Sequence, residues 1–307
     1  MEQRTLRQGA NSLRGGGVPN SLFAQLREQS TLCESQSQDS TDYMRFKEAI
    51  YHKTGIDLNL YKQQQMQRRL YNMVERAGLK TFEEYFALIN SDENELFSFL
   101  DRMTINVSEL FRNPEKWHEV QNSILPSLLK ERSSLRIWSA GCSYGAEPYT
   151  LAVLLDQISS GMRYTLHATD LDRKILAKAR DGYFTTTDVK GVAAPLLSKY
   201  FLTLDRAKEL QSNPTVPTYQ VRPEIRNRVS FQQHNLLADR FDRDYDLICC
   251  RNVVIYFTEE AKEHLYLQFV QSLRIGGYLF VGGTERILNY TEIGLENPYP
   301  FFYRRLR

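Results

Sequence analysis

The arrangement of this chain is decided by residues 135–148, whose sequence is LRIWSAGCSYGAEP. Residues 135–140 form a short apolar run that is typical of a buried strand, and a turn with two glycines follows it. Pro148 suits the first turn of a helix, which we expect at residues 148–158. A strand, a turn and a helix in this order begin a βαβ unit, so the sequence predicts a parallel sheet covered by helices.

The alternation of short apolar runs and helical patterns continues toward the C-terminus. We expect further strands at residues 164–169, 229–234, 245–250 and 277–281, helices at 173–179 and 259–273, and an edge strand at 301–304. Between residues 190 and 228 two short runs, 199–202 and 218–221, interrupt this alternation and predict a small antiparallel β insertion. The predicted fold class is therefore α/β, with a doubly wound, mostly parallel sheet.

The sequence before this sheet reads differently. Apolar residues at helical spacing, such as Met66, Leu70 and Met73, predict about four helices between residues 41 and 114. Residues 1–40 are rich in Ser, Gln and Gly and look like a disordered leader. We thus expect a leader at 1–40, a small all-α domain at 41–114 and, beginning with a helix at 115–131, a sheet domain at 115–307 with the insertion at about 190–228.

Composition limits the partners of the chain. Of 307 residues, 42% are hydrophobic and 25% charged, which is ordinary for a globular protein. Thirty-nine basic against thirty-seven acidic residues give a charge of +2, too balanced for a general nucleic-acid binder. No apolar run reaches the roughly 18 residues of a membrane span, and the polar start is unlike a signal peptide. The four cysteines lack metal-ligand spacing. We expect a cytoplasmic protein with no membrane insertion and no metal site.

Polar residues follow four of the predicted strands, where an open parallel sheet binds its ligand. They are Glu147 after the first strand, Asp170 after the second, Asn235 with Leu236 after the third, and Arg251, Asn252 and Tyr256 after the fourth. A carboxylate such as Asp170 can accept hydrogen bonds from ribose hydroxyls, while Asp172 can cap the next helix. Asn235 suits either an adenine edge or a turn cap.

The same first turn also matches a different chemistry. Gly141, Ser143 and Gly145 fit the G-x-S-x-G nucleophile elbow of serine hydrolases, with His167, His234 and His264 as possible partners. That elbow normally follows several strands, whereas only helices precede it here, so a hydrolase is the weaker alternative.

Four motifs, read together, resemble the CheR family, the bacterial chemotaxis receptor glutamate methyltransferases. They are NVSELFR at 106–112, WSAGCSYGAEPY at 138–149, TDLD at 169–172 and CRNVVIYF at 250–257, and the likeness extends from Tyr43 to Phe302. The resemblance implies a Rossmann-like methyltransferase domain behind an all-α domain. It also implies that a methyl group passes from S-adenosylmethionine to glutamate carboxylates of chemoreceptors, which gives glutamate methyl esters.

The resemblance further implies roles for individual residues. Tyr256 and Asn252 would stand nearest the methyl group as catalytic residues, and the cofactor would be bound by Asn106, Ser108, Arg112, Glu147, Asp170, Asn235, Leu236, Arg251 and Asn252. The family usually has Thr at the position of Ser108 and often Glu at that of Ala146. A glutamate carboxylate has a reference pKa of about 4.3 and is already an anion at neutral pH, so this chemistry needs no general base.

Lys62, Arg69 and Arg76 recur every seven residues and are predicted to form one basic stripe on a helix. Such a stripe is usually a solvated face. The resemblance makes it a surface for docking the cytoplasmic methylation helices of chemoreceptors, which are acidic coiled coils, with the enzyme as a monomer. Two alternatives stay open: a methyltransferase of another substrate, and a cofactor-binding regulator without turnover.

Overall fold

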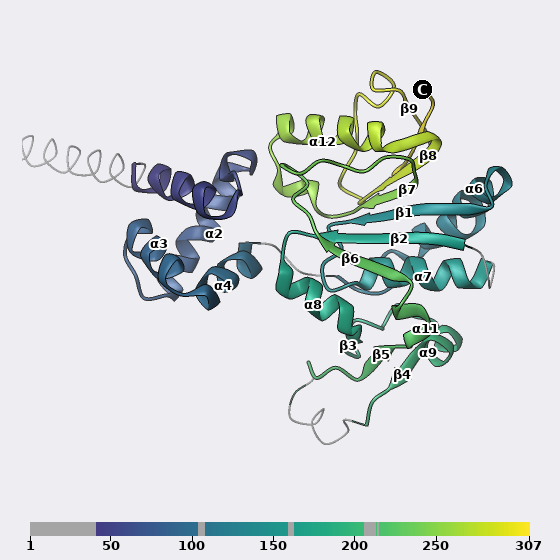
Figure 1. Cartoon of the computed structure of the whole chain (residues 1–307), viewed down its shortest axis with the longest axis horizontal. Coiled ribbons are helices and arrows are strands. Elements are labelled where there is room, and N and C mark those ends of the chain that lie inside the picture. Colours follow the sequence, from purple (N-terminus) through teal and green to yellow (C-terminus); the bar gives the residue numbers. More distant parts are fainter. Residues whose placement is uncertain (1–40, 104–107, 159–162, 206–212, 214) are drawn as a thin grey trace, which may run out of the picture.

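The computed structural model describes residues 41–103, 108–158, 163–205, 213 and 215–307. In Figure 1 the N-terminal helices lie beside one end of a large sheet, and a smaller sheet lies below it. This is the predicted class, an α/β fold preceded by an all-α domain, and the prediction is confirmed. The predicted leader at 1–40 falls outside the described residues.

The N-terminal part is a cluster of short helices around its own apolar core. Residues 41–54 are helical. The 3-10 turn η1 (Leu58–Leu60) and helices α2 (Gln63–Arg76), α3 (Phe82–Ser91) and α4 (Glu93–Met103) follow. Thr81 and Glu84 form a capping box that fixes the start of α3, because each side chain accepts a hydrogen bond from the other residue's backbone N–H. Met66, Leu70 and Met73 of α2 are buried in this core, as their spacing predicts.

One predicted helix is interrupted. Residues 115–131 form α5 (Pro114–Glu119), a π-helical turn η2 (Val120–Ile124) and α6 (Leu125–Glu131). Pro126 lies in the first turn of α6 and has no backbone N–H to donate to residue 122. The missing i to i−4 hydrogen bond accounts for the widened turn just before it.

The large sheet has seven strands in the order β6-β2-β1-β7-β8-β10-β9. Five are parallel: β1 (Ser134–Ala140), β2 (Arg163–Asp170), β6 (Val229–Gln233), β7 (Tyr245–Cys250) and β8 (Leu273–Val281). Strand β10 (Phe302–Arg305) pairs antiparallel with β8 and with β9 (Leu295–Tyr299). The edge strand on this side is β9, so the strand predicted at 301–304 forms as β10 but lies one place in from the edge. The strand order reverses between β1 and β7, which is where such sheets bind ligands.

Helices cover both faces of this sheet. Side chains alternate along β1, so that Leu135 and Ile137 join the core on the α6 and α7 (Ala146–Ile158) side, whereas Trp138 and Ala140 join the core on the α12 (Glu259–Ser272) side. Helix α8 (Arg173–Asp181) follows β2, and the short helix α11 (Pro223–Arg226) precedes β6. Because α7 is buried nearly all round, its position between sheet and insertion is fixed.

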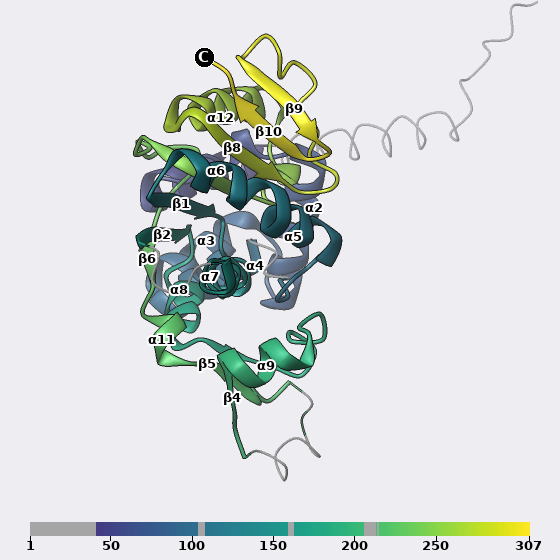
Figure 2. The same ribbon diagram turned by 90° about the vertical axis from the view of Figure 1, so that its right-hand side faces the viewer.

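The insertion is a three-stranded antiparallel sheet in the order β3-β5-β4. It consists of β3 (Tyr183–Phe184), helix α9 (Ala194–Tyr200), β4 (Phe201–Thr203) and β5 (Tyr219–Val221). Figure 2 shows it at the opposite end of the domain from β9 and β10. Its first strand comes before residue 190, earlier than predicted, because Gly182 ends α8 in the left-handed conformation and turns the chain at once into β3. Within the described residues, no helix is both long and apolar enough to cross a bilayer.

Candidate active site

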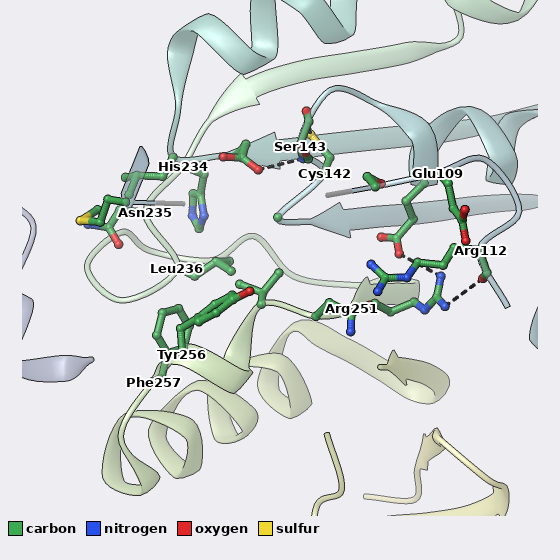
Figure 3. Close-up of a pocket in the computed structure, with 18 of the residues that line it drawn as sticks. Glu109, Arg112, Cys142, Ser143, His234, Asn235, Leu236, Arg251, Tyr256 and Phe257 are labelled. Atoms are coloured by element: carbon green, nitrogen blue, oxygen red, sulfur yellow. Dashed lines mark hydrogen bonds and ion pairs between the residues drawn. The ribbon is translucent and has the colours of Figure 1, made fainter. Parts of the chain in front are cut away.

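A pocket opens at the carboxyl ends of β1, β2, β6 and β7, between the sheet and the N-terminal helices (Figure 3). The empty space inside it, including the part open to solvent, is about 1080 Å³. It brings together all the predicted catalytic and cofactor residues that the structure describes: Ser108, Arg112, Glu147, Asp170, Asn235, Leu236, Arg251, Asn252 and Tyr256. Asn106 lies outside the described residues.

The turn after β1 is shaped for a close approach. Gly141 has a φ of 80°, and a Cβ added there would lie 2.4 Å from Cγ2 of Val253. The neighbouring Asp170 is 8% exposed, and its carboxylate accepts hydrogen bonds from the backbone N–H groups of Ser143 at 2.8 Å and Asp172 at 3.1 Å. Burial raises the pKa of Asp170, although these N–H groups oppose the shift. The carboxylate of Asp170 lines the pocket, while Asp172 caps α8 as predicted.

Arg251 lines the pocket and is the centre of a buried cluster. Its guanidinium lies 3.7 Å from the carboxylate of Glu147 and donates to the carbonyl oxygen of Arg112 at 3.1 Å and to Oδ1 of Asn113 at 2.9 Å. The rings of Trp117 and Phe280 also contact the guanidinium, at 5.1 and 4.6 Å from their centroids. The cluster fixes the backbone of the segment that carries Arg112.

Glu147 is held from both sides. Its Oε1 accepts a hydrogen bond from the hydroxyl of Ser139 at 2.7 Å, and its Oε2 faces Arg251. Burial raises the pKa of Glu147, while the Arg251 guanidinium opposes this shift. The residue therefore joins β1, α7 and the end of β7 at the floor of the pocket.

The segment before α5 reaches the pocket in a constrained conformation. Phe111 and Asn113 have positive φ values of 56° and 61° on either side of Arg112. The backbone N–H of Phe111 donates to the hydroxyl of Thr150 at 3.0 Å, which ties the segment to α7. Strained backbone of this kind persists where the surrounding structure holds it, and it commonly marks functional sites. Figure 3 shows Arg112 beside Arg251 at one end of the pocket.

The other end of the pocket is formed by the turn after β6. His234, Asn235 and Leu236 lie there, away from Arg112 (Figure 3). Oδ1 of Asn235 accepts the backbone N–H of Leu237 at 3.0 Å, so the turn-cap interpretation holds for this oxygen. The amide of the same side chain is a donor that a ligand can use.

A buried carboxylate that sequence analysis missed supports the turn after β7. Glu285 is 3% exposed and accepts three backbone hydrogen bonds, from Gly282 at 2.6 Å, Asn252 at 2.7 Å and Val254 at 3.0 Å. Asn252 has a φ of 61°, a conformation that a non-glycine residue adopts at a cost. Glu285 thus holds in place the turn that leads to Tyr256. An isolated acid after an apolar strand gave no motif by which to find it.

The N-terminal helices also contribute to the pocket, which the sequence did not indicate. Tyr61 and Met103 line it from that side. Tyr61 forms an isolated antiparallel bridge with Phe257, and the two rings meet edge to face at 5.2 Å. Burial, together with the charge of Asp170, raises the pKa of Tyr61. Neither residue belongs to a motif, so only a three-dimensional arrangement could reveal them.

The basic stripe of α2 differs from the prediction in one respect. Arg76 is exposed, but Lys62 and Arg69 are half-buried, and Arg69 is directed toward the ring of Tyr256. The flank of α2 near its start packs against the sheet domain, so the stripe is not a uniformly solvated face. Arg68 is exposed beside it.

The geometry disfavours the serine-hydrolase alternative. Ser143 lines the pocket with a φ of 50°, as a nucleophile elbow would. However, His167 lies in the middle of β2 against Tyr245, and His264 lies on α12. His234 directs Nε2 to the carbonyl oxygen of Arg240 at 3.3 Å. A hydrolase would need one of these rings to act as the base for the serine.

Comparison with known proteins gives consistent matches over both parts of the chain. The family "CheR methyltransferase, SAM binding domain" matches residues 106–296, and "CheR methyltransferase, all-alpha domain" matches residues 41–104. A "Chemotaxis protein methyltransferase" of Listeria innocua is 38% identical over 263 residues, which cover 85% of this chain and 96% of the relative. One of Escherichia coli is 30% identical over 272 residues, 86% of this chain and 89% of the relative.

Proposed function

Because this chain belongs to the CheR methyltransferase family, we propose that it transfers a methyl group from S-adenosylmethionine to glutamate side chains of chemoreceptors. The proposal depends on one observation above all. The segments that resemble the family, although far apart in sequence, meet in a single pocket at the strand tips, with Arg112 at one end and the turn that carries Asn235 and Leu236 at the other.

The residues present fit the cofactor in one orientation. The carboxylate of Asp170 would accept hydrogen bonds from the ribose hydroxyls. Arg112 would bind the carboxylate of the methionine part, since a guanidinium pairs with a carboxylate through two parallel hydrogen bonds. Leu171 and Leu236 offer apolar contacts to the adenine, and Asn235 offers an amide donor. Arg251 and Glu147 would act mainly by holding Arg112 and the floor of the pocket.

For this reaction the protein has to align the glutamate oxygen with the methyl group and exclude water. When bound, the cofactor supplies a methyl group on a sulfonium, whose thioether is the leaving group. The attacking glutamate oxygen needs no base, since it is already ionised at neutral pH. Holding two reactants in line can remove about 7–11 kcal/mol of a barrier. Asn252 and Tyr256 are proposed to supply this alignment from the turn that Glu285 supports.

The phenol of Tyr256 suits this task. Burial raises its pKa, with the nearby guanidinium of Arg69 opposing the shift, so the hydroxyl stays protonated at neutral pH. A protonated phenol can donate a hydrogen bond to a carboxylate oxygen, and this contact would orient the incoming glutamate.

We propose that the receptor docks on basic residues of α2 and its N-cap: the exposed Arg76 and the half-buried Lys62 among those predicted, with the exposed Arg68 beside them. Acidic methylation helices would be attracted by this charge, and the attraction would weaken with added salt. Because those helices lie in the cytoplasm, the proposed location of the enzyme is cytoplasmic. A monomer would suffice, since every group named above comes from one chain.

Methyl transfer from radiolabelled S-adenosylmethionine to acidic receptor helices tests the proposal. Label that mild alkali releases as methanol is the expected result, because carboxyl methyl esters hydrolyse in this way. Alkali-stable label would point to a methyltransferase of nitrogen. Tight cofactor binding without labelled product on any receptor preparation would favour a regulator without turnover.

A further inference from the structure

The N-terminal helices are joined to the catalytic turn at one short segment. The backbone N–H of Lys62 donates to the carbonyl oxygen of Tyr256 at 2.9 Å, and the N–H of Thr258 donates to that of Leu60 at 2.9 Å. Helix α2 begins at the next residue, Gln63. The start of the proposed docking helix is therefore fixed to the backbone of the catalytic tyrosine.

Arg69 makes a second connection between the same two elements. Its Cζ lies 5.4 Å from the centroid of the Tyr256 ring, a cation–π arrangement. The same guanidinium donates from Nη1 to the carbonyl oxygen of Met103, where α4 ends. Met103 and Tyr256 both line the pocket, whereas Arg69 is not among the described residues that line it.

These contacts are at odds with a role for Arg69 in docking alone. Arg76, two turns along the helix, is exposed and has its charge in solvent. Arg69 is half-buried, with its guanidinium directed to the Tyr256 ring and to a carbonyl oxygen. A planar guanidinium can stack on a ring and donate in its own plane at once, which the compact ammonium of lysine does less well.

We propose that Arg69 is a positioning residue for methyl transfer, which holds the ring of Tyr256 toward the pocket by stacking on it while anchored to the Met103 carbonyl oxygen. This inference rests on the proposed function and adds to it. Helix α2 would then have two parts with different tasks: exposed cations that attract the receptor, and Arg69, which links the helix to the tyrosine.

The first test separates positioning from docking by kinetics. In Arg69→Gln, kcat at saturating receptor should fall about five- to tenfold. The salt dependence of kcat/KM and the affinity for S-adenosylhomocysteine should stay as in the wild type. Arg69→Lys keeps the charge and should recover little of the lost kcat. Arg45→Gln, which removes an exposed arginine from the helix at residues 41–54, is the matched control.

A docking role predicts the opposite pattern. KM for the receptor would rise in Arg69→Gln, kcat would be kept, the salt dependence would weaken and lysine would restore activity. That pattern would overturn the proposal.

A double-mutant cycle tests whether Arg69 acts through Tyr256. In the Tyr256→Ala background, Arg69→Gln should reduce kcat no further, since the ring it holds is gone. If Arg69→Gln reduced kcat by the same factor with and without Tyr256→Ala, the two residues would act independently and the proposal would be contradicted.

A spectroscopic measurement keeps the inference testable if receptor methylation itself is not found. With 3-fluorotyrosine placed at position 256, ¹⁹F NMR of the full chain should give one resonance that shifts or broadens in Arg69→Gln but not in Arg45→Gln. An unchanged resonance would refute the positioning role. Failure of the wild-type enzyme to methylate receptors would instead refute the proposed function.

Discussion

Two buried carboxylates, Asp170 and Glu285, hold the turns of this site through backbone N–H groups. A carboxylate in such a place loses its water, and the N–H groups replace only part of what is lost. Burial accordingly raises the pKa of both. Asp170 faces the pocket and is available to a ligand, whereas Glu285 is engaged with its own chain.

The raised pKa of Asp170 predicts a pH dependence of cofactor binding. Ribose hydroxyls donating to the carboxylate favour its charged form, so the bound state should have the lower pKa and binding should release protons. Affinity should therefore fall as the pH drops through the raised pKa of the free protein. Calorimetry with S-adenosylhomocysteine between about pH 8 and about pH 5 would measure this. In Asp170→Asn, S-adenosylhomocysteine should bind more weakly, and its affinity should change less steeply with pH.

The control for this measurement is Asp205→Asn, a change at an exposed carboxylate beyond β4. Its pH profile should follow that of the wild type. If Asp170→Asn kept the full slope, the titrating group would lie elsewhere, with Glu147 the next candidate because its pKa is also raised by burial.

For Glu285→Gln we expect a loss of both stability and turnover. The side-chain NH2 of the glutamine would replace a carboxylate oxygen that accepts backbone hydrogen bonds. A backbone N–H would then lose its acceptor, and leaving such a buried donor unpaired costs about 1–3 kcal/mol. Unfolding by urea measures this loss. Since Asn252 would also be released from its positive φ, kcat should fall more than cofactor affinity does. The exposed Glu224→Gln should change neither, and equal effects of the two changes would exclude the proposed support of the turn.

At this scale the sequence indicated the residues that stand in motifs and missed those that act only in three dimensions. Asp170 and Arg251 could be predicted because each follows a recognisable strand. The contacts of Arg251 with Trp117 and Phe280 could not be predicted, because they join segments far apart in sequence. Tyr61 was not predicted, because its role depends on how two domains meet.

At the scale of elements, the apolar runs in the sequence predicted the positions of those strands that are buried on both faces. Strand β7 spans Tyr245–Cys250, as predicted. Strand β9 was missed, because its sequence LENPY contains a proline and polar residues and reads as a loop. It forms only because β10 offers it a partner. Pairing of this kind is a tertiary effect that a single sequence does not show.

Helix α2 gives the prediction that belongs to this scale. Arg76→Glu should raise KM for the receptor about two- to tenfold and weaken the salt dependence of kcat/KM, since an exposed docking charge is reversed. Cofactor affinity and kcat at saturation should change little. The KM of Arg76→Gln for the receptor should lie between those of the wild type and of Arg76→Glu, because this change removes the charge without reversing it. A parallel loss of cofactor binding would mean misfolding, and an unchanged KM would place docking on another surface.

At the scale of the whole molecule, the pocket lies where two parts meet, each of which has its own hydrophobic core. The N-terminal helices have their own apolar cluster, and the sheet domain has others. Among the described residues, their junction includes the bridge between Tyr61 and Phe257, the two backbone hydrogen bonds beside it, the contacts of Arg69, and α4 against α8, where Nζ of Lys174 lies 4.6 Å from the centroid of the Phe97 ring. Because each part has its own core, the junction can open without unfolding either part, and a ligand that contacts both sides should close it.

Hydrogen exchange should detect this closure. The amide hydrogens of Lys62 and Thr258 donate across the junction, so they should exchange whenever it opens. At S-adenosylhomocysteine concentrations of about a hundred times Kd, their exchange should slow by about a hundredfold, which corresponds to about 2.7 kcal/mol of stabilisation. The amide of Leu204, which donates to Thr218 in the insertion, should be unaffected because its opening leaves the pocket intact. Equal slowing at all three amides would show that the chain opens as one unit, and no slowing at Lys62 would mean that the ligand does not span the junction.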